Sequence, residues 1–347
     1  MALQRATVAR SPTIPGYIRR PSREDQNAED MTPRTTADDR RPPGTTLATG
    51  DQWVIGHGHQ RAVITEMGAT IRAFTVNDVP VIDGFGTDEW SHGGRGQVLA
   101  PWPNRLGDGR YEFEGMSAQA ALDEPSRQNA IHGLVRWLPW SMAGRAQNRV
   151  TMACVLHPSP GYPFTLGLSI EYRLGRDGLT VVTEAENLGP TGLPFGLGFH
   201  PYLTVGTPVV DMARLTVPAD RRLITDDRGL PTGEAPVAGT EFDFTTGRLL
   251  GTSRLDTGYT SFRRDGDGRI RVELDHPDGT MGVSLWADQR FDYVMVYSGD
   301  TLGAGERRRS LAIEPMTCPP DALRSGNDII VLGPGARWTG SWGITPR

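Results

Sequence analysis

The sequence predicts an all-β protein, and three observations support that class. Glycine (43 residues) and proline (27) are abundant among the 347 residues, whereas aromatic residues make up only 7%, which is typical of a chain with many turns. Apolar residues recur at every second position in many short segments, as expected for strands that bury one face. No segment keeps a helical period over three turns. We therefore predict a large antiparallel β-sandwich of many strands.

The first 48 residues differ in composition from the rest of the chain. They are rich in Arg, Asp, Pro, Ser and Thr, and their apolar residues follow no period, so they cannot bury enough surface to fold. We predict a disordered N-terminal extension over residues 1–48 and one folded domain over residues 49–347. The extension lacks the apolar core of a signal peptide, and Met31 leaves open a natural start further into the chain.

Strand-like segments then follow in order. The stretch "RAVITEMGATIRAFTVNDVPVI" (61–82) predicts two strands with a bend at Gly68 and a turn at "VNDV". The stretch "VTMACVL" (150–156) alternates with Cys154 on its apolar face, which predicts a buried cysteine. Residues 164–189 predict a long hairpin that turns at "GRDG". Further strands are predicted at "RIRVEL" (269–274), "MGVSLWA" (281–287), "YVMVY" (293–297), "RSLAIE" (309–314) and "IIVLGPG" (329–335).

Charge and cysteine content exclude several classes of function. The net charge of -5 arises from 36 basic and 41 acidic residues, interspersed along the predicted domain, so neither a nucleic-acid surface nor a membrane anchor is expected. The sequence contains no lysine, which excludes Schiff-base catalysis and a P-loop. Cys154 and Cys318 predict free thiols, and no apolar run is long enough to span a membrane. We expect a cytoplasmic protein whose partner is a small neutral molecule.

Metal and cofactor motifs are weak or missing. His57 and His59 in "HGH" could share one strand face, but no third ligand stands nearby, so we expect an exposed pair. The stretch "DGDGR" (265–269) lacks the later ligands of a calcium loop and predicts a hairpin turn. The sequence has no GxSxG, HExxH or strand-linked GxGxxG motif. We predict no metal site and no cofactor.

Four stretches interrupt the strands with polar residues among Gly and Pro, which is how loops and strand ends build a pocket on a β scaffold. They are "LAPWPNRLGDGRYEFEG" with Asn104 and Arg105, "NAIHGLVRWLPW" with His132, "PFGLGFHPYLTV" with His200, and "LAIEPMTCPPDAL" with Glu314. Each residue alone is more simply explained as a turn former, a core histidine or a paired carboxylate. Together they supply a carboxylate, two imidazoles, a guanidinium and an amide, and such departures from regular strands tend to be functional.

These stretches resemble a known family. "PWPNR", "IHG", "HPY" and "IEPMT" occur in the order found in the aldose 1-epimerase (galactose mutarotase) family, and the sequence is most similar to its bacterial branch with an HPY motif. "WADQRFDYVMVYSGD" (286–300) and "EPMTCPPDALRSG" are also similar to that branch. The resemblance covers roughly residues 50–345. It implies a β-supersandwich with an open sugar cleft, no cofactor, and interconversion of the α and β anomers of an aldose.

The resemblance also implies roles for individual residues. Glu314 in "IEP" would be the general base and His200 in "HPY" the general acid. Arg105 and His132, with Asn104 beside Arg105, would bind the sugar. Asp256 in "RLDTGYTSF" resembles the aspartate that holds sugar hydroxyls.

Elementary chemistry is consistent with this pair. Opening a cyclic hemiacetal removes a proton from the C1 hydroxyl and delivers one to the ring oxygen, so a base and an acid must flank the anomeric carbon. A buried Glu314 with a raised pKa is a suitable base, and His200 as an imidazolium is a suitable acid. Rotation about C1–C2 and reclosure exchange their roles. We expect Pro315 to stop strand pairing and leave Glu314 facing the cleft.

Several alternatives stay open. A hexose-6-phosphate mutarotase, a non-catalytic carbohydrate-binding protein and a glycoside hydrolase or lyase all occur on similar sandwiches. A free aldose, a sulfonated or uronic sugar and a hexose 6-phosphate all stay open as the substrate, and the oligomeric state, monomer or homodimer, is not determined by the sequence. Hydrolysis would need a second carboxylate, for which Asp256 is the candidate. Four tryptophans are candidates for a sugar-stacking platform, although such residues more often lie in the core. They are Trp102, Trp137, Trp140 and Trp286.

Overall fold

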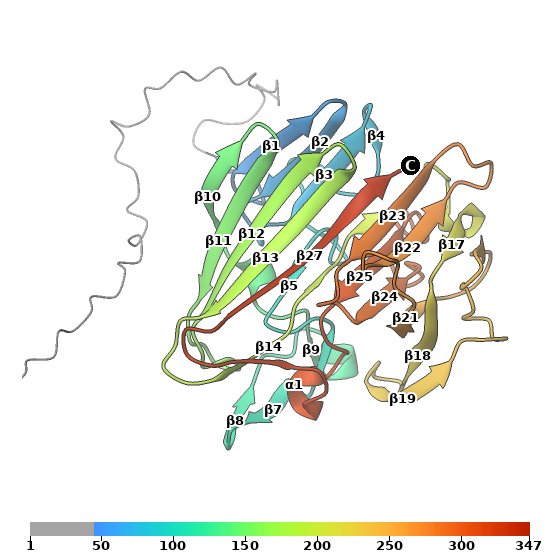
Figure 1. Cartoon of the computed structure of the whole chain (residues 1–347). Coiled ribbons are helices and arrows are strands. Elements are labelled where there is room, and N and C mark those ends of the chain that lie inside the picture. Colours follow the sequence, from blue (N-terminus) through green and yellow to red (C-terminus); the bar gives the residue numbers. More distant parts are fainter. Residues whose placement is uncertain (1–44) are drawn as a thin grey trace, which may run out of the picture. The chain divides into compact units, whose positions relative to one another are not determined.

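The computed structural model describes residues 45–347, and strands dominate its regular structure (Figure 1). The all-β prediction is confirmed. The predicted extension, residues 1–48, lies outside the described residues except for residues 45–48. Its disorder and the domain boundary that follows it remain predictions.

Two large antiparallel sheets form the body of the described residues. The nine-stranded sheet contains, in order, β10 (Ser141–Ala146), β11 (Arg149–Leu156), β12 (Leu166–Gly175), β13 (Gly178–Asn187), β27 (Arg337–Pro346), β23 (Gly282–Ala287), β22 (Ile270–Asp275), β17 (Arg214–Thr216) and β20 (Arg248–Leu249). The eight-stranded sheet contains β19 (Pro231–Pro236), β18 (Ala219–Thr225), β21 (Asp256–Phe262), β24 (Tyr293–Tyr297), β25 (Leu311–Met316), β15 (Gly198–Phe199) and β5 (Val98–Leu99), with β16 (Tyr202–Leu203) also paired to β25.

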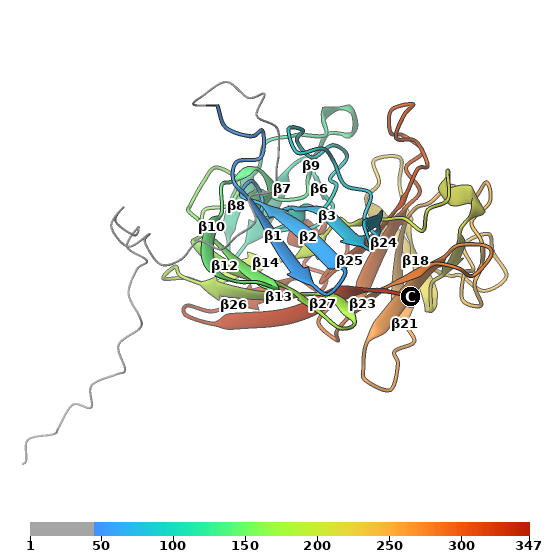
Figure 2. The same ribbon diagram turned by 90° about the horizontal axis from the view of Figure 1, so that it is seen from above.

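Smaller elements complete the fold. A four-stranded sheet contains β1 (Gln52–His57), β2 (Gln60–Thr65), β3 (Ile71–Val76) and β4 (Val79–Pro80). Three strand pairs join β6 (Arg105–Gly107) to β9 (Asn129–Ile131), β7 (Arg110–Phe113) to β8 (Met116–Gln119), and β14 (Leu193–Phe195) to β26 (Ile330–Leu332). The helical elements are α1 (Ala322–Ser325) and 3-10 turns at Pro125–Arg127, Val135–Trp137 and Val210–Met212. In Figure 2 the four-stranded sheet lies beside the nine-stranded one, where β1 and β2 contact β12.

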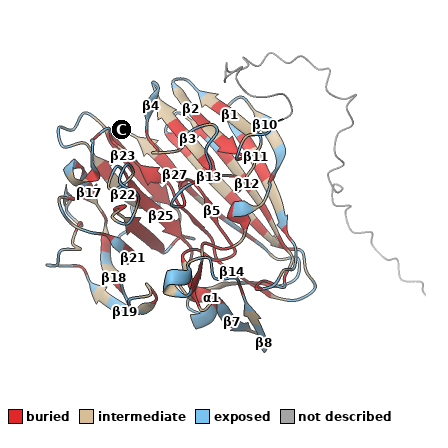
Figure 3. Cartoon of the chain, turned by 180° about the vertical axis from the view of Figure 1, so that it is seen from behind, coloured by how far each residue is buried: buried red, intermediate tan, exposed pale blue. Residues whose placement is uncertain are grey.

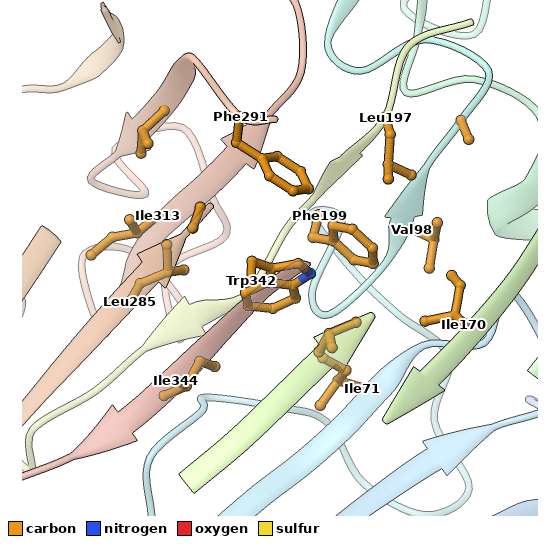
Figure 4. Close-up of a cluster of buried hydrophobic side chains, with 14 of the residues drawn as sticks. Ile71, Val98, Ile170, Leu197, Phe199, Leu285, Phe291, Ile313, Trp342 and Ile344 are labelled. Atoms are coloured by element: carbon orange, nitrogen blue, oxygen red, sulfur yellow. The ribbon is translucent and has the colours of Figure 1, made fainter. Parts of the chain in front are cut away.

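The main core lies between the two large sheets. Figure 4 shows apolar side chains from both sheets meeting there, and the rings of Phe199 (β15) and Trp342 (β27) lie 4.9 Å apart. Buried residues run along the central strands of both sheets, whereas β8 and β19 are mostly exposed (Figure 3). Strands β15 and β25, which carry or precede two of the residues singled out from the sequence, are therefore anchored by core packing on one face.

Several local predictions are confirmed and others need correction. The long hairpin is β12–β13, which closes with Gly175 opposite Gly178. Cys154 is half-buried, not buried, and it lies just past Ala153, where the pairing of β11 with the edge strand β10 ends. The "DGDGR" stretch is a tight turn in which Gly268 N–H donates to the Asp265 carbonyl. It is not a hairpin, since it joins β21 of one large sheet to β22 of the other.

The prediction that Pro315 stops strand pairing is wrong. β25 continues through Pro315, which lies opposite Val294 of β24. On the other edge of β25, Ile313 and Thr317 donate N–H groups to carbonyls of the segment that contains β15 and β16. Pro315 stands between these two donors on the same edge, so the ladder loses one hydrogen bond there without ending.

In the part of the chain that the structure describes, no helix has the length and apolar character needed to cross a membrane. His57 and His59 are both exposed at the turn between β1 and β2, as predicted.

Candidate active site

The residues singled out from the sequence line a single cavity of about 470 Å³. They come from separate strands and loops, and they are Asn104, Arg105, His132, His200, Asp256 and Glu314. The fold therefore brings all of them together. We name the deeply buried group, Glu314, His200 and His132, the pocket floor.

Strand alternation explains why Glu314 faces the pocket. Ile313 points into the core between the two large sheets (Figure 4), and side chains of consecutive strand residues point to opposite faces. Glu314 therefore points away from that core, near the middle of β25, which has hydrogen-bonded neighbours on both edges. The side chain is only 2% exposed. The carboxyl group is thus held in a dry, rigid position.

His200 reaches the same point from a neighbouring segment. It follows Phe199 of β15, which is buried in the core, and its N–H donates to the Gln97 carbonyl while its carbonyl accepts from Gly96. The ring stacks on Tyr202 with centroids 5.0 Å apart. Nε2 of His200 lies 3.4 Å from Oε1 of Glu314. Backbone hydrogen bonds and ring stacking thus aim the imidazole at the carboxyl group.

Close packing around His200 also explains why residue 94 is a glycine. Gly94 has φ +81°, and a Cβ built there would lie 2.6 Å from Cδ2 of His200. A larger residue at this position would displace the imidazole.

Both members of the pair keep an unused polar atom. Within residues 45–347, Nδ1 of His200 and Oε2 of Glu314 are buried without a hydrogen-bond partner. Burial, and to a smaller extent Asp256, raises the pKa of Glu314 well above its usual value, against the opposing charge of Arg105. Burial, with Arg136 and Arg95, lowers the pKa of His200 to about 3. Both pKa shifts favour the uncharged forms, with a proton on Glu314 and a neutral imidazole at His200, whereas the sequence led us to expect an imidazolium.

His132 completes the pocket floor. Its ring lies 5.2 Å from that of His200 in an edge-to-face arrangement, and its Nδ1 has no hydrogen-bond partner among the described residues. Burial first, and then the nearby charges of His200, Arg136 and Arg105, lower its pKa well below 6.5. His132 is therefore neutral and able to exchange hydrogen bonds with a ligand.

Asn104 shapes the loop that carries His132. Both residues have positive φ, +56° and +64°, and the His132 N–H donates to the Asn104 carbonyl. The Asn104 side-chain oxygen accepts from the N–H of Arg105. The glycine after His132 is also required, because a Cβ at Gly133 would lie 2.1 Å from the Ala100 carbonyl oxygen. The "NR" motif (Asn104, Arg105) and the "HG" motif (His132, Gly133) thus hold two backbone segments together beside the pocket.

Arg105 is oriented by a carboxylate that the sequence analysis missed. Its Nε and Nη2 donate to both oxygens of Glu124, at 2.9 and 3.1 Å. The side-chain amide of Asn129 also donates to Glu124, at 2.9 Å. Burial would raise the pKa of Glu124, but these hydrogen bonds outweigh it and lower the pKa. Glu124 stands eight residues before His132 in "DEPSRQN", a surface-like stretch that gave no local signal.

Asp256 lies at the open side of the pocket. It begins β21 and is 42% exposed, and its Oδ2 lies 3.7 Å from Arg105 and 3.9 Å from Arg127. We name Arg105, Glu124, Asp256 and Arg127 the pocket wall. The wall therefore presents polar groups of both signs around a hollow large enough for a small polar molecule.

Two further arginines near the floor were not predicted. Arg136 pairs with Asp123 at 2.6 Å and lines the pocket. Arg95 is 1% exposed, and its guanidinium lies 4.6 Å from the ring of Tyr202, behind His200. Their positions depend on tertiary packing, and the 36 arginines of the sequence give no means of choosing them.

Over residues 45–347, no group of three or more His, Cys, Asp or Glu side chains is arranged to hold a metal ion.

The comparisons with known proteins are consistent with this geometry. A family model described as Aldose 1-epimerase matches residues 51–345, so the chain belongs to the aldose 1-epimerase family and is an isomerase. The chain is 32% identical over 288 residues to the Escherichia coli protein named Uncharacterized protein YihR, covering 83% of this chain and 90% of that protein. It is 30% identical over 292 residues to the galactose mutarotase of Sus scrofa, covering 77% and 82%.

Solved structures share the fold. A GalM/aldose epimerase homologue from C. elegans superposes with a TM-score of 0.77 and 19% identity, covering 86% of this chain and 98% of that one. The galactose mutarotase-like fold predicted from the sequence is thereby confirmed.

Proposed function

We propose that this protein interconverts the α and β anomers of a free, neutral aldose, with Glu314 and His200 as the acid–base pair. The observation that carries the proposal is the 3.4 Å approach of His200 Nε2 to Glu314 Oε1 on the pocket floor. The C1 hydroxyl oxygen and the ring oxygen of a cyclic sugar are bonded to the same carbon. Two groups this close together are able to reach both oxygens at once.

The proton balance supports a reversible exchange. We take the resting pair to hold one proton, on Glu314, with a neutral His200 that has a free lone pair, because the raised pKa of Glu314 and the lowered pKa of His200 favour this state. In this state Glu314 donates to the ring oxygen while His200 accepts the C1 hydroxyl proton, which opens the ring to the aldehyde. Rotation about C1–C2 presents the other carbonyl face, and the reverse transfers close the ring as the other anomer. Each residue therefore acts as acid in one direction and as base in the other.

The remaining residues would bind and orient the sugar. The paired Arg105 guanidinium, the Asp256 carboxylate and the neutral His132 ring offer donors and acceptors on several sides of the cavity. Sugar hydroxyls form both kinds of hydrogen bond, so such a mixed lining suits them.

The charge balance of the pocket favours a neutral sugar over a sugar phosphate. Each of the three arginines that line the cavity has a carboxylate within 4 Å: Glu124 for Arg105, Asp256 for Arg127 and Asp123 for Arg136. A phosphate would have to compete with these partners. Hydrolysis is also disfavoured, because the group facing Glu314 is an imidazole rather than a second carboxylate.

Polarimetry on freshly dissolved α-glucose and α-galactose tests the proposal. We expect the enzyme to accelerate the decay of optical rotation well beyond the buffer rate, with a weaker effect or none on glucose 6-phosphate. No acceleration with any free aldose would reject the proposal. Sugar binding without acceleration would indicate a non-catalytic carbohydrate-binding protein.

A further inference from the structure

The two exposed tryptophans of residues 45–347 lie together at the edge of the pocket. Trp90 is 56% exposed and Trp137 is 41% exposed, and their ring centroids are 5.9 Å apart. Among the platform candidates from the sequence, Trp102, Trp140 and Trp286 are buried. Only Trp137 therefore remains available, and it is joined by Trp90, which the sequence analysis did not select.

This pair is continuous with the proposed sugar site. Trp137 lines the cavity, and so do Ser91, which follows Trp90 directly, and Gly93 of the same loop before β5. Trp137 ends a 3-10 turn that begins three residues after His132 of the pocket floor. Trp137 therefore lines the same cavity as the reacting groups, and Trp90 is joined to that cavity through Trp137 and Ser91.

The indole rings are held by neighbouring side chains. The Arg136 guanidinium lies 5.1 Å from the Trp137 ring and is itself fixed by Asp123. Trp90 contacts the ring of His92 edge to face at 5.3 Å. The planes of the two indoles are tilted by 43°, so they form an open, angled surface. Leaving such large apolar rings in water is costly, and an exposed aromatic pair beside a pocket is typical of a binding site.

We propose that Trp90 and Trp137 form a second subsite, which holds the non-reducing pyranose ring of a reducing disaccharide. This inference rests on the proposed function, since the reducing ring of the same sugar would occupy the site of Glu314 and His200. Anomer exchange needs a free C1 hydroxyl, so any extension of the substrate leaves from another position of the ring. An aryl group attached at C1 is thereby excluded as the occupant.

The chemistry of the surface selects a sugar ring. The C–H face of a pyranose packs on aromatic rings, and the hydroxyls at its edge remain in water above a half-exposed platform. The cavity of about 470 Å³ lies within the range of roughly 300–1,000 Å³ that is common for small-molecule sites. Arg127 and Arg136 are each already paired with a carboxylate, so we expect the second sugar ring to be uncharged.

Kinetics with glucose, maltose and cellobiose test the subsite. For Trp137→Ala and Trp90→Ala we expect kcat/KM to fall about 5- to 10-fold for at least one disaccharide, as expected for loss of one aromatic contact. The value for glucose should change less than about 2-fold, since that sugar does not reach the platform. Trp137→Phe and Trp90→Phe, which keep an aromatic face, should retain most of the disaccharide activity. Val331→Ala, at a 54% exposed position of β26 outside the pocket, is the matched surface control.

Three outcomes would overturn the subsite. They are equal losses for glucose and disaccharide, a wild-type enzyme that accelerates glucose but neither disaccharide, and an alanine variant whose oligomeric state differs from wild type in size-exclusion chromatography. The change of oligomeric state would indicate that Trp90 and Trp137 mediate contact between copies of this chain. Failure of the proposed function is a separate result, namely no acceleration of any sugar. In that case, quenching of tryptophan fluorescence by maltose but not glucose, lost in Trp137→Ala, would still support the subsite, and its absence would reject it.

Discussion

Glu314 on the pocket floor and Glu124 in the pocket wall are the same residue type in opposite environments. Glu124 accepts hydrogen bonds from Arg105 and Asn129, and its pKa is lowered. Glu314 has no arginine partner within ion-pair distance among the described residues, one of its oxygens has no hydrogen bond, and its pKa is raised. The wall therefore keeps its charges satisfied and fixed, whereas the floor keeps groups whose protons are able to move.

The largest expected effect comes from removing the movable proton. We expect Glu314→Gln to lower kcat for anomer exchange by about 10³-fold or more, since one acid–base residue contributes about 10²–10⁴-fold. The unfolding temperature should be unchanged or up to about 4 °C higher, because the amide, unlike the carboxyl group, cannot ionise in this buried position. A loss of activity accompanied by a clear fall in the unfolding temperature would instead show a structural role.

The raised pKa of Glu314 also predicts how the stability difference between Glu314→Gln and wild type depends on pH. A raised pKa of Glu314 means that the folded state binds more protons than the unfolded state above the ordinary carboxyl value, so its contribution to stability falls as pH rises. The thermal advantage of Glu314→Gln over wild type should therefore grow as pH rises from 5. An advantage that shrinks with pH would contradict a raised pKa.

The pH–rate profile separates the two possible resting states of the pair. With the pKa of His200 lowered to about 3, a second proton binds only in strong acid, so kcat/KM should not fall between pH 7 and 5. A catalytic histidine with an ordinary pKa of about 6.5 that must be neutral would instead cause a fall of about 25-fold over that range. Initial rates by polarimetry, with circular dichroism to confirm folding at each pH, distinguish these results. The lowered pKa also means that stability contributed by His200 is lost as pH falls from 6.5 toward 3.

Gly94 offers a test of how accurately the floor must be positioned. We expect Gly94→Ala to lower kcat by about 10- to 100-fold, because its Cβ would displace His200, and misplacing a reacting group by about 1 Å costs about 100-fold. Gly115→Ala is the matched control, since Gly115 has φ +80° but no atom within 4 Å of a built Cβ. Similar activity losses in both variants would show that backbone strain, not the contact with His200, is responsible.

The smallest effect is expected in the wall. Glu124→Gln should raise KM about 5- to 10-fold and change kcat by less than about 3-fold, because a charge-assisted pair that orients Arg105 is weakened while the reacting groups stay in place. Glu234→Gln, in the exposed pair with Arg221, provides a control that should leave both constants unchanged. A fall in kcat at constant KM for Glu124→Gln would place Glu124 with the floor instead.

Much of the fold and part of the site could be predicted from the sequence. Period-two alternation identified β12, β13 and β22–β25, since that pattern is local. The motifs selected Glu314, His200 and Arg105, which the fold brings together from distant segments.

What the sequence could not provide depends on tertiary neighbours. Pro315 was expected to end pairing, but the ladder tolerates it because only one edge loses a donor. The lowered pKa of His200 follows from burial and from two arginines remote in sequence. Glu124 and Trp90 stand in polar loops without periodicity, and only three-dimensional contacts reveal their proximity to the pocket.

The most direct test of the central claim, that Glu314 and His200 work as one unit, is a double-mutant cycle of anomeric exchange. Exchange NMR spectroscopy on glucose at equilibrium would give rates for wild type, Glu314→Gln, His200→Gln and the double variant. If both groups serve a single coupled proton transfer, each single variant should lose most of the rate and the double variant should lose little more. The account would be contradicted if the rate loss of the double variant equalled the product of the two single losses. It would also be contradicted if the His200 variant exchanged anomers at a near wild-type rate.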